Sequence, residues 1–185
     1  MNASSKPPGW IENRQLLLAG PIDDGLSNDL IARLLFLNSA DGHRPIHLLI
    51  NSAGGSVVAG LAIYDTIKDL TCPVHTFSLG LTAGIALHLL AGGKKGMRGA
   101  LQGARFVLIR AHIGGATGEI DATTEDRVSM EMQRLENALC RSMAAETGLP
   151  ERTFADLLRN GSYMFDVREA LRLRFIDYVG FSTPV

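Results

Sequence analysis

Residues 50–98 read INSAGGSVVAGLAIYDTIKDLTCPVHTFSLGLTAGIALHLLAGGKKGMR, and this stretch decides the fold. It holds the end of an apolar strand, a Gly-rich turn, a helix over 57–70, a strand over 73–80, a tight turn at Gly84 and an apolar helix. Strands that alternate with helices through short connections are typical of a mostly parallel sheet. We therefore expect an α/β protein with these turns at the carboxyl ends of neighbouring strands, where open α/β sheets bind ligands.

The remainder of the chain continues the alternation of strands and helices. Further strands are expected over 14–20, 45–51, 104–115 and 175–180, and a long helix is expected over 125–148. Pro150 is well placed to open the next helix, and Asp166 to Glu169 has the spacing of a capping box before another. No internal repeat or linker is visible, so residues 1–185 are expected to form one domain, with residues 1–13 as a short N-terminal tail.

Composition excludes several classes of protein. The 185 residues carry a formal net charge of -1 and are 46% hydrophobic, as in a globular chain without a nucleic-acid-binding basic excess. No run reaches the length of about 18 apolar residues that a membrane span needs. The two cysteines, Cys72 and Cys140, are expected to be inert in a reduced, cytoplasmic protein. The spacing of His43, His47 and His75 indicates no metal site, and no cofactor is expected.

The turn around Gly84 has the pattern that holds a nucleophile in many α/β hydrolytic enzymes, a strand that turns sharply into a helix. Gly54 and Gly55 permit close backbone approach to a ligand. The backbone amides near Gly55 and at Ile85 are candidates for an oxyanion hole. Gly-rich connections of this kind also occur without any ligand, and spacing alone leaves both interpretations open.

The same residues resemble the proteolytic subunit of the Clp protease, the ClpP family of the ClpP/crotonase superfamily. INSAGGSVVAGLAIYDTI is similar to the family pattern INSPGGSVxAGxAIYDTM, and GLTAGIALHLLAGGKKGMR to GxAASMGAxLLxAGxKGKR. HIGG, ETG and DVREALRLRFID resemble further family motifs, so the resemblance covers about residues 14–180. It implies stacked ββα units with a mostly parallel sheet, a protruding handle helix within a handle region of about 116–148, and assembly into rings.

The resemblance also implies a Ser-His-Asp catalytic triad, and all three positions are changed here. The serine position falls on Gly84 and the aspartate position on Ser162. The histidine position falls on Arg110 when counted back from the following glycines, and on Ile109 when counted forward. Gly84 cannot act as a nucleophile, neither Arg110 nor Ile109 can act as a general base near neutral pH, and Ser162 offers no orienting carboxylate. We therefore expect no serine-peptidase activity, although Gly54, Gly55 and Ile85 match the family's oxyanion positions.

Two departures bear on assembly. Only about a dozen residues precede the first strand, which puts docking of a Clp chaperone in doubt. The stretch Leu158 to Ser162 lacks the charged pattern that pairs rings in the family. The expected partners are nevertheless other ring subunits, in a homo-oligomeric ring such as a heptamer or double ring, or in a hetero-ring with active paralogues.

Three functions remain open from the sequence. The first is a non-proteolytic structural or regulatory ring subunit. The second is a repurposed enzyme that acts on a small acyl or carbonyl compound, with His88 and His112 as replacement catalytic residues beside Arg110. The third is a module that binds an extended peptide without cleaving it. For each histidine, a packed or loop position is the simpler interpretation.

Overall fold

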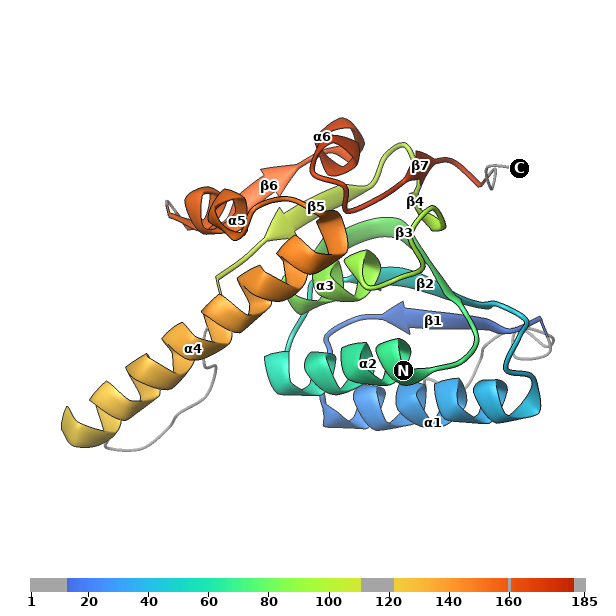
Figure 1. The fold of residues 1–185 in the computed structure, drawn as a ribbon, viewed down its shortest axis with the longest axis horizontal. Helices are drawn as coiled ribbons and strands as arrows, with labels where there is room; N and C mark the ends of the chain where they lie inside the picture. Colours follow the sequence, from blue (N-terminus) through green and yellow to red (C-terminus); the bar gives the residue numbers. More distant parts are fainter. Residues whose placement is uncertain (1–12, 111–121, 160, 182–185) are drawn as a thin grey trace.

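The computed structural model describes residues 13–110, 122–159 and 161–181, and the described chain forms a mixed α/β fold (Figure 1). The N-terminal half alternates strand and helix: β1 (Gln15–Ala19), α1 (Asp24–Ala40), β2 (Ile46–Ser52), α2 (Val57–Asp69), β3 (Val74–Ala83) and α3 (Ile85–Ala91). The C-terminal half consists of β4 (Arg98–Ala100), β5 (Arg105–Leu108), α4 (Ala122–Thr147), α5 (Glu151–Leu158), β6 (Tyr163–Phe165), α6 (Val167–Arg172) and β7 (Tyr178–Val179).

The sheet is mostly parallel, as expected. Its main path runs β1-β2-β3-β4-β7, and every pairing along it is parallel. β3 is long enough to pair with β4 through its first half and with β5 through its second half. β6 then adds to β5 as the antiparallel edge of the sheet. The short strands β4 and β6 were not expected from the sequence, because three residues are too few to show a periodic pattern.

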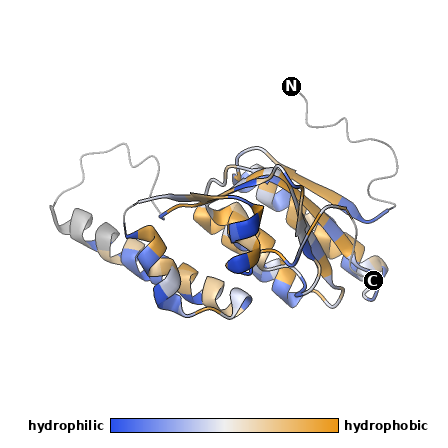
Figure 2. Ribbon diagram, turned by 90° about the horizontal axis from the view of Figure 1, so that it is seen from above, coloured by the Kyte–Doolittle hydropathy of each residue, from blue (hydrophilic) through white to orange (hydrophobic). Residues whose placement is uncertain are grey.

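Alternating burial along the strands fixes which face meets the helices. On β2, Ile46, Leu48 and Ile50 are fully buried in the hydrophobic core, whereas the residues between them are half-buried or exposed. The helices α1 and α2 pack their apolar sides against this core and turn polar residues outward, whereas every residue of α3 is buried (Figure 2). Strands with this alternation bury one face and leave the other less covered.

Side-chain caps define the starts of three helices. Asp23 accepts a hydrogen bond from the amide of Leu26 at the start of α1, and Ser56 from that of Ala59 at the start of α2. Asp166 accepts bonds from the amides of Arg168 and Glu169, as a capping residue does. Only half of the expected capping box forms, because the Glu169 carboxylate bonds to Tyr163 and Arg172 instead.

The long helix α4 begins three residues earlier than the sequence pattern predicts and extends away from the sheet at its N-terminal end (Figure 1). Near its C-terminal end Leu139, Cys140 and Met143 are buried against the body of the protein. Met130, further out on the same helix, is 59% exposed. The expected strand over 104–115 is shorter in the structure, since β5 ends at Leu108 and residues 111–115 lie outside the described ranges.

No helix among the described residues is long and apolar enough to cross a lipid bilayer.

Candidate functional site

The site is built around the turn at Gly84, which joins the end of β3 to the start of α3. Gly84 has φ 54° and ψ -128°, a backbone conformation that residues with a side chain adopt only under strain. Its amide donates a hydrogen bond of 3.0 Å to the carbonyl of Val107 on β5. This bond fixes the turn to the neighbouring strand. The sharp strand-to-helix turn expected from the sequence is therefore present.

The loop that contains Gly54 and Gly55 lies directly against this turn. A Cβ on Gly54 would stand 2.7 Å from the carbonyl oxygen of Ala83 and 3.4 Å from the amide nitrogen of Ile85. A Cβ on Gly55 would stand 2.2 Å from the carbonyl oxygen of Ile22. Only glycine fits at either position, because real Cβ atoms do not approach other heavy atoms this closely. The structure thus brings together the three residues, Gly54, Gly55 and Ile85, that the sequence grouped as oxyanion positions.

A third glycine holds α2 close to the same turn. The Cβ of any larger residue at Gly60 would stand 2.2 Å from Cγ1 of Ile85. Since Ile85 is 4% exposed and packs in the core, the first residue of α3 is held from two sides. The sequence showed the GG pair as a motif, whereas the role of Gly60 depends on a helix contact that no spacing rule contains.

The open side of Gly84 has room for a side chain. The nearest atoms to an added Cβ would be the carbonyl oxygen of Ala53 at 3.8 Å and Cδ1 of Ile109 at 3.9 Å, both ordinary contact distances. A cavity of about 60 Å³ lies here, and its lining is mostly apolar. Its ten lining residues are Ala53, Gly55, Val57, Gly84, Ile85, His88, Leu108, Ile109, Arg110 and Leu139.

Strand register places the other two expected positions. β5 and β6 are antiparallel, and their last pair is Leu108 with Tyr163, so Ile109 stands directly after β5 and Ser162 directly before β6. Ile109 is the side chain that approaches Gly84. Arg110 instead forms an ion pair of 3.1 Å with Glu136 on α4. Arg110 therefore connects the end of β5 to the long helix.

His88 lines the same cavity, one helical turn beyond Gly84, as the sequence predicted. It is 4% exposed, and its Nε2 lies 3.1 Å from the carbonyl oxygen of Leu139, so the neutral ring carries its proton on Nε2. Its Nδ1 is buried without a hydrogen-bond partner. Burial lowers the pKa of His88, while the carbonyls of Leu139 and Gly84 act in the opposite direction. The contacts place His88 in the packing between α3 and α4.

Other polar side chains near the turns hold structural positions, and one predicted residue lies outside the described ranges. His112 lies outside the described residues. Ser56 caps α2, and Thr82 is buried with its hydroxyl 2.8 Å from that of Ser78. Both cysteines are buried and free, and burial raises the pKa of the Cys140 thiol, which disfavours its reactive form.

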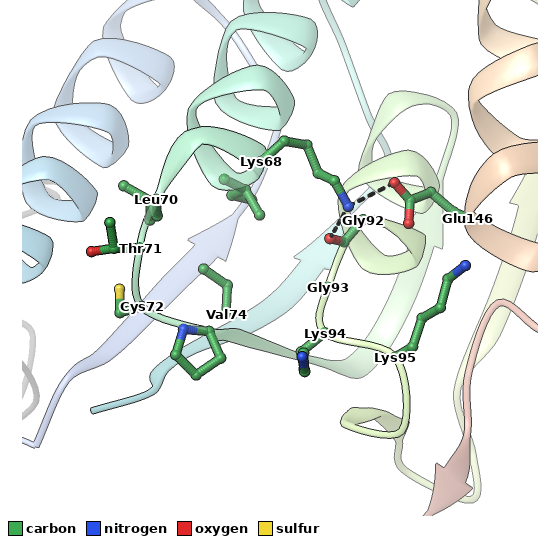
Figure 3. A pocket seen from close by; sticks show the side chains of 12 residues that line it. Lys68, Leu70, Thr71, Cys72, Val74, Gly92, Gly93, Lys94, Lys95 and Glu146 are labelled. Carbon is green, nitrogen blue, oxygen red and sulfur yellow. Dashed lines mark hydrogen bonds and ion pairs between the residues drawn. The ribbon is translucent and has the colours of Figure 1, made fainter. Parts of the chain in front are cut away.

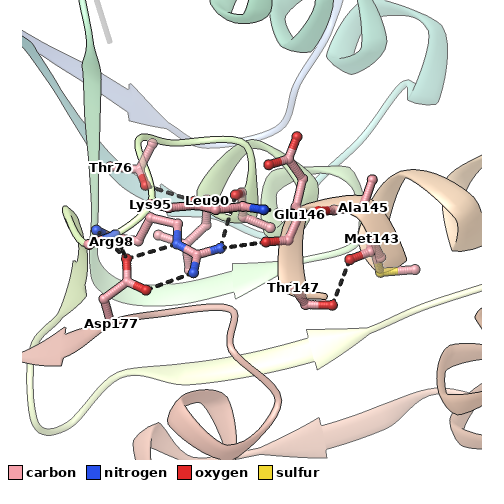
Figure 4. Close-up of polar contacts among 11 residues, drawn as sticks. Thr76, Leu90, Lys95, Arg98, Met143, Ala145, Glu146, Thr147 and Asp177 are labelled. Carbon is pink, nitrogen blue, oxygen red and sulfur yellow. Dashed lines mark hydrogen bonds and ion pairs between the residues drawn. The ribbon is translucent and has the colours of Figure 1, made fainter. Parts of the chain in front are cut away.

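A buried polar network anchors the C-terminal end of α4 (Figure 4). Arg98 on β4 is 3% exposed and donates to both carboxylate oxygens of Asp177, at 2.9 and 2.7 Å. The same guanidinium donates to the carbonyl oxygens of Ala91, at the end of α3, and Glu146, on α4, each at 3.3 Å. One side chain therefore connects the sheet, α3, α4 and the segment before β7. Sequence reasoning missed this arginine, because an isolated basic residue in a short strand has no pattern.

A second cavity, about 490 Å³, lies at the other end of the sheet, where α2 ends and β3 begins (Figure 3). Lys68 extends across it to the Glu146 carboxylate at 2.8 Å and to the carbonyl of Gly92 at 3.4 Å. Lys95 donates to the carbonyl of Ala145 at 3.1 Å. Both lysines therefore bind the C-terminal end of α4, Lys68 through the Glu146 side chain and Lys95 through a carbonyl of the last turn. No group of three or more His, Cys, Asp or Glu side chains that could hold a metal occurs in the part of the chain described.

The fold and the turn define an α/β protein whose candidate site is a strand-to-helix nucleophile turn backed by a glycine loop. Comparison with known proteins is specific: the model of the family described as Clp protease matches residues 9–183. The chain belongs to the Clp protease family.

Two relatives show the extent of the similarity. The chain is 41% identical over 167 residues to the protein named ATP-dependent Clp protease proteolytic subunit 2 of Prochlorococcus marinus (strain MIT 9312), covering 90% of this chain and 80% of the relative. It is 39% identical over 168 residues to the protein named ATP-dependent Clp protease proteolytic subunit 3 of Synechococcus sp. (strain CC9902), covering 90% and 82%.

Proposed function

We propose that this chain is a Clp-type ring subunit that does not cleave peptides and that contributes structure or regulation to the assembly. The observation that carries the proposal is the turn at Gly84: its backbone has the nucleophile-bearing conformation and open space, but residue 84 has no side chain. Peptide hydrolysis by this family's chemistry needs a nucleophile, a general base and a group that orients the base. Gly84 supplies no nucleophile, neither Ile109 nor Arg110 supplies a general base, and Ser162 supplies no carboxylate.

Ring assembly is supported by membership, because proteins of the Clp protease family normally form ring oligomers. We place the contact with a neighbouring subunit at the outer part of α4, where Met130 is exposed. Whether the ring contains only this chain or also active paralogues is part of the proposal, as is a cytoplasmic location. The network around Arg98 supports a rigid attachment for α4, which an interface helix needs.

The alternative of a repurposed enzyme has less support. Gly54, Gly55 and Ile85 lie together, so backbone amides for a developing oxyanion stay available to it. A cavity of about 60 Å³ is, however, far smaller than the roughly 300 Å³ or more of ordinary ligand pockets. His88 is also held in the core by Leu139. The peptide-binding alternative differs from both, because it predicts binding of an extended peptide without turnover.

The test combines an activity assay with a measurement of mass. Purified protein is incubated with a fluorogenic peptide, alone and after mixing with an active Clp proteolytic subunit, and the assemblies are weighed by native mass spectrometry. We expect no hydrolysis by the chain alone and a ring-sized mass in at least one of the two conditions. Peptide hydrolysis by the chain alone would overturn the non-proteolytic part, and a monomer in both conditions would overturn the ring-subunit part.

A further inference from the structure

Two histidines that the candidate site does not use lie side by side on neighbouring strands. His47 on β2 and His75 on β3 are direct partners in the parallel register of the sheet. Their rings are perpendicular, with centroids 5.0 Å apart. Both residues belong to the face of the sheet turned away from the core, because Ile46 and Leu48, which alternate with His47, are fully buried in it.

Neither ring has a hydrogen-bond partner among the described residues, although both are partly buried. The two rings contact each other. Among the described residues, the ring nitrogens of His47 and His75 are not buried unpaired atoms, so they are open to solvent and two adjacent imidazoles can bind a ligand from it. His47 bonds through its backbone amide to the carbonyl of Arg14, which fixes the position of the strand rather than the ring.

We propose that His47 and His75 bind one divalent late first-row metal ion, zinc or copper, with water completing its coordination. Neutral imidazole is a preferred ligand of these ions. Two ring nitrogens, each about 2.0–2.1 Å from one metal and at a tetrahedral angle, put the ring centroids about 5 Å apart. The observed separation of 5.0 Å meets that requirement, and the ring torsions that aim the nitrogens are soft.

The surroundings set the expected strength of this site. Burial lowers the pKa of both imidazoles, so the rings are available in the neutral form that binds metal. The charge of Lys94 also lowers the pKa of His75, and the same charge repels a cation. Gln15 on β1 is the partner of His47 in the register and offers an amide oxygen on the same row. A site with two protein nitrogens beside a lysine is expected to be weaker than four-ligand structural sites.

The site goes beyond the proposed ring-subunit function and does not depend on it. It could not be found from spacing, because the two ligands are 28 residues apart and meet only through the sheet. Motif-based recognition of zinc sites relies on ligands a few residues apart in the chain. Here the parallel pairing of β2 with β3 brings the two ligands together, as a short motif does in other metal sites.

The test uses the full chain with Zn²⁺ and Cu²⁺ as probes. We compare the unchanged protein with His47→Ala and His75→Ala in isothermal titration calorimetry and by Cu²⁺ electron paramagnetic resonance. The matched control is His43→Ala, which removes an exposed histidine from the loop before β2. We expect one ion per chain, nitrogen couplings from two imidazoles, and a loss of affinity of roughly tenfold or more in each site variant but not in the control.

Circular dichroism on each variant shows whether the sheet is kept, and His75→Gln serves as a second substitution of similar size. No ion bound by the unchanged protein would overturn the proposal. Equal losses in His43→Ala and His47→Ala would also overturn it, as would a copper spectrum with a single imidazole. None of these outcomes bears on peptide hydrolysis or ring mass, so failure here is distinguishable from failure of the proposed function.

Discussion

The side chain of Ile109 lies over the open side of Gly84, with its Cδ1 3.9 Å from the place where a Cβ of residue 84 would stand. Of the two residues expected at the base position, Ile109 approaches Gly84, whereas Arg110 pairs with Glu136. Ser162 stands directly before β6, next to the last β5–β6 pair, Leu108 with Tyr163. Under the proposed function, all three triad positions lack a catalytic group.

Restoring a single residue is therefore expected to restore nothing. In Gly84→Ser the new hydroxyl has room but no base to take its proton, so a fluorogenic peptide assay should stay at background. In the triple variant Gly84→Ser, Ile109→His and Ser162→Asp, we expect hydrolysis measurably above background, because nucleophile, base and carboxylate become neighbours.

The matched control is Gly84→Ala combined with the same two other changes. It carries the base and the carboxylate without the hydroxyl, and it should be inactive. Equal rates in the control and the triple variant would mean that the turnover does not use residue 84, and the assignment of Ile109 as the base position would fail.

We expect the substitutions Gly55→Ala and Gly96→Ala to lower the stability of the fold by very different amounts. Gly55→Ala sets a Cβ 2.2 Å from the backbone oxygen of Ile22, so the loop or β1 must move, and we expect a loss of more than about 3 kcal/mol. Gly96→Ala, at φ 86° with nothing within 4 Å of the added Cβ, should cost only about 1–2 kcal/mol of backbone strain. Urea denaturation of both variants measures the difference, and similar losses would contradict the close approach.

Much of this fold was predictable because its signals are local. The strand and helix periods of 45–51 and 57–70, and the turn at Gly84, coincide with β2, α2 and the start of α3. The features that sequence reasoning missed depend on partners distant in the chain. Gly60 is required by Ile85, and Arg98 by Asp177, 79 residues later. Counting residues leaves both Ile109 and Arg110 as candidates for the histidine position, and it does not show that Ile109 approaches Gly84 while Arg110 pairs with Glu136.

Breaking the Arg98–Asp177 pair should destabilise the fold strongly. Burial opposes ionisation of Asp177, but the hydrogen bonds from Arg98 outweigh it, and the pKa of the carboxyl lies below its ordinary value. In Arg98→Met the carboxylate loses this partner, and the carbonyls of Ala91 and Glu146 lose a donor, so we expect a loss of about 3 kcal/mol. Arg33→Met, which removes an exposed pair with Asp29, should cost less than about 1 kcal/mol.

The Arg98–Asp177 pair also predicts how acid changes the stability of the fold. Because the pKa of Asp177 is lower in the folded state, its contribution is present above the unfolded value and is lost as pH falls below it. Chemical denaturation at several values of pH should show a smaller loss on acidification in Asp177→Asn than in the unchanged protein. An equal loss in both proteins would show that this carboxylate does not contribute to acid sensitivity.

His88 should make the fold sensitive to mild acid. Burial lowers the pKa of His88, and the carbonyls of Leu139 and Gly84 and the charge of Glu146 oppose this effect only in part. The folded state therefore keeps the ring neutral. In the unfolded chain the ring takes up a proton near its ordinary pKa of about 6.5. Its contribution is therefore fully present above that pH and decreases as pH falls below it, by up to about 1.4 kcal/mol per pH unit. In His88→Leu this part of the slope should disappear, leaving the slope from His47 and His75, whose pKa values burial also lowers. Leu89→Met, which changes the adjacent buried residue without a titrating group, should keep the full slope.

The test is the free energy of unfolding of each variant, measured between pH 5 and pH 8. An unchanged slope in His88→Leu would mean that the ring is protonated, or hydrated, in the folded protein.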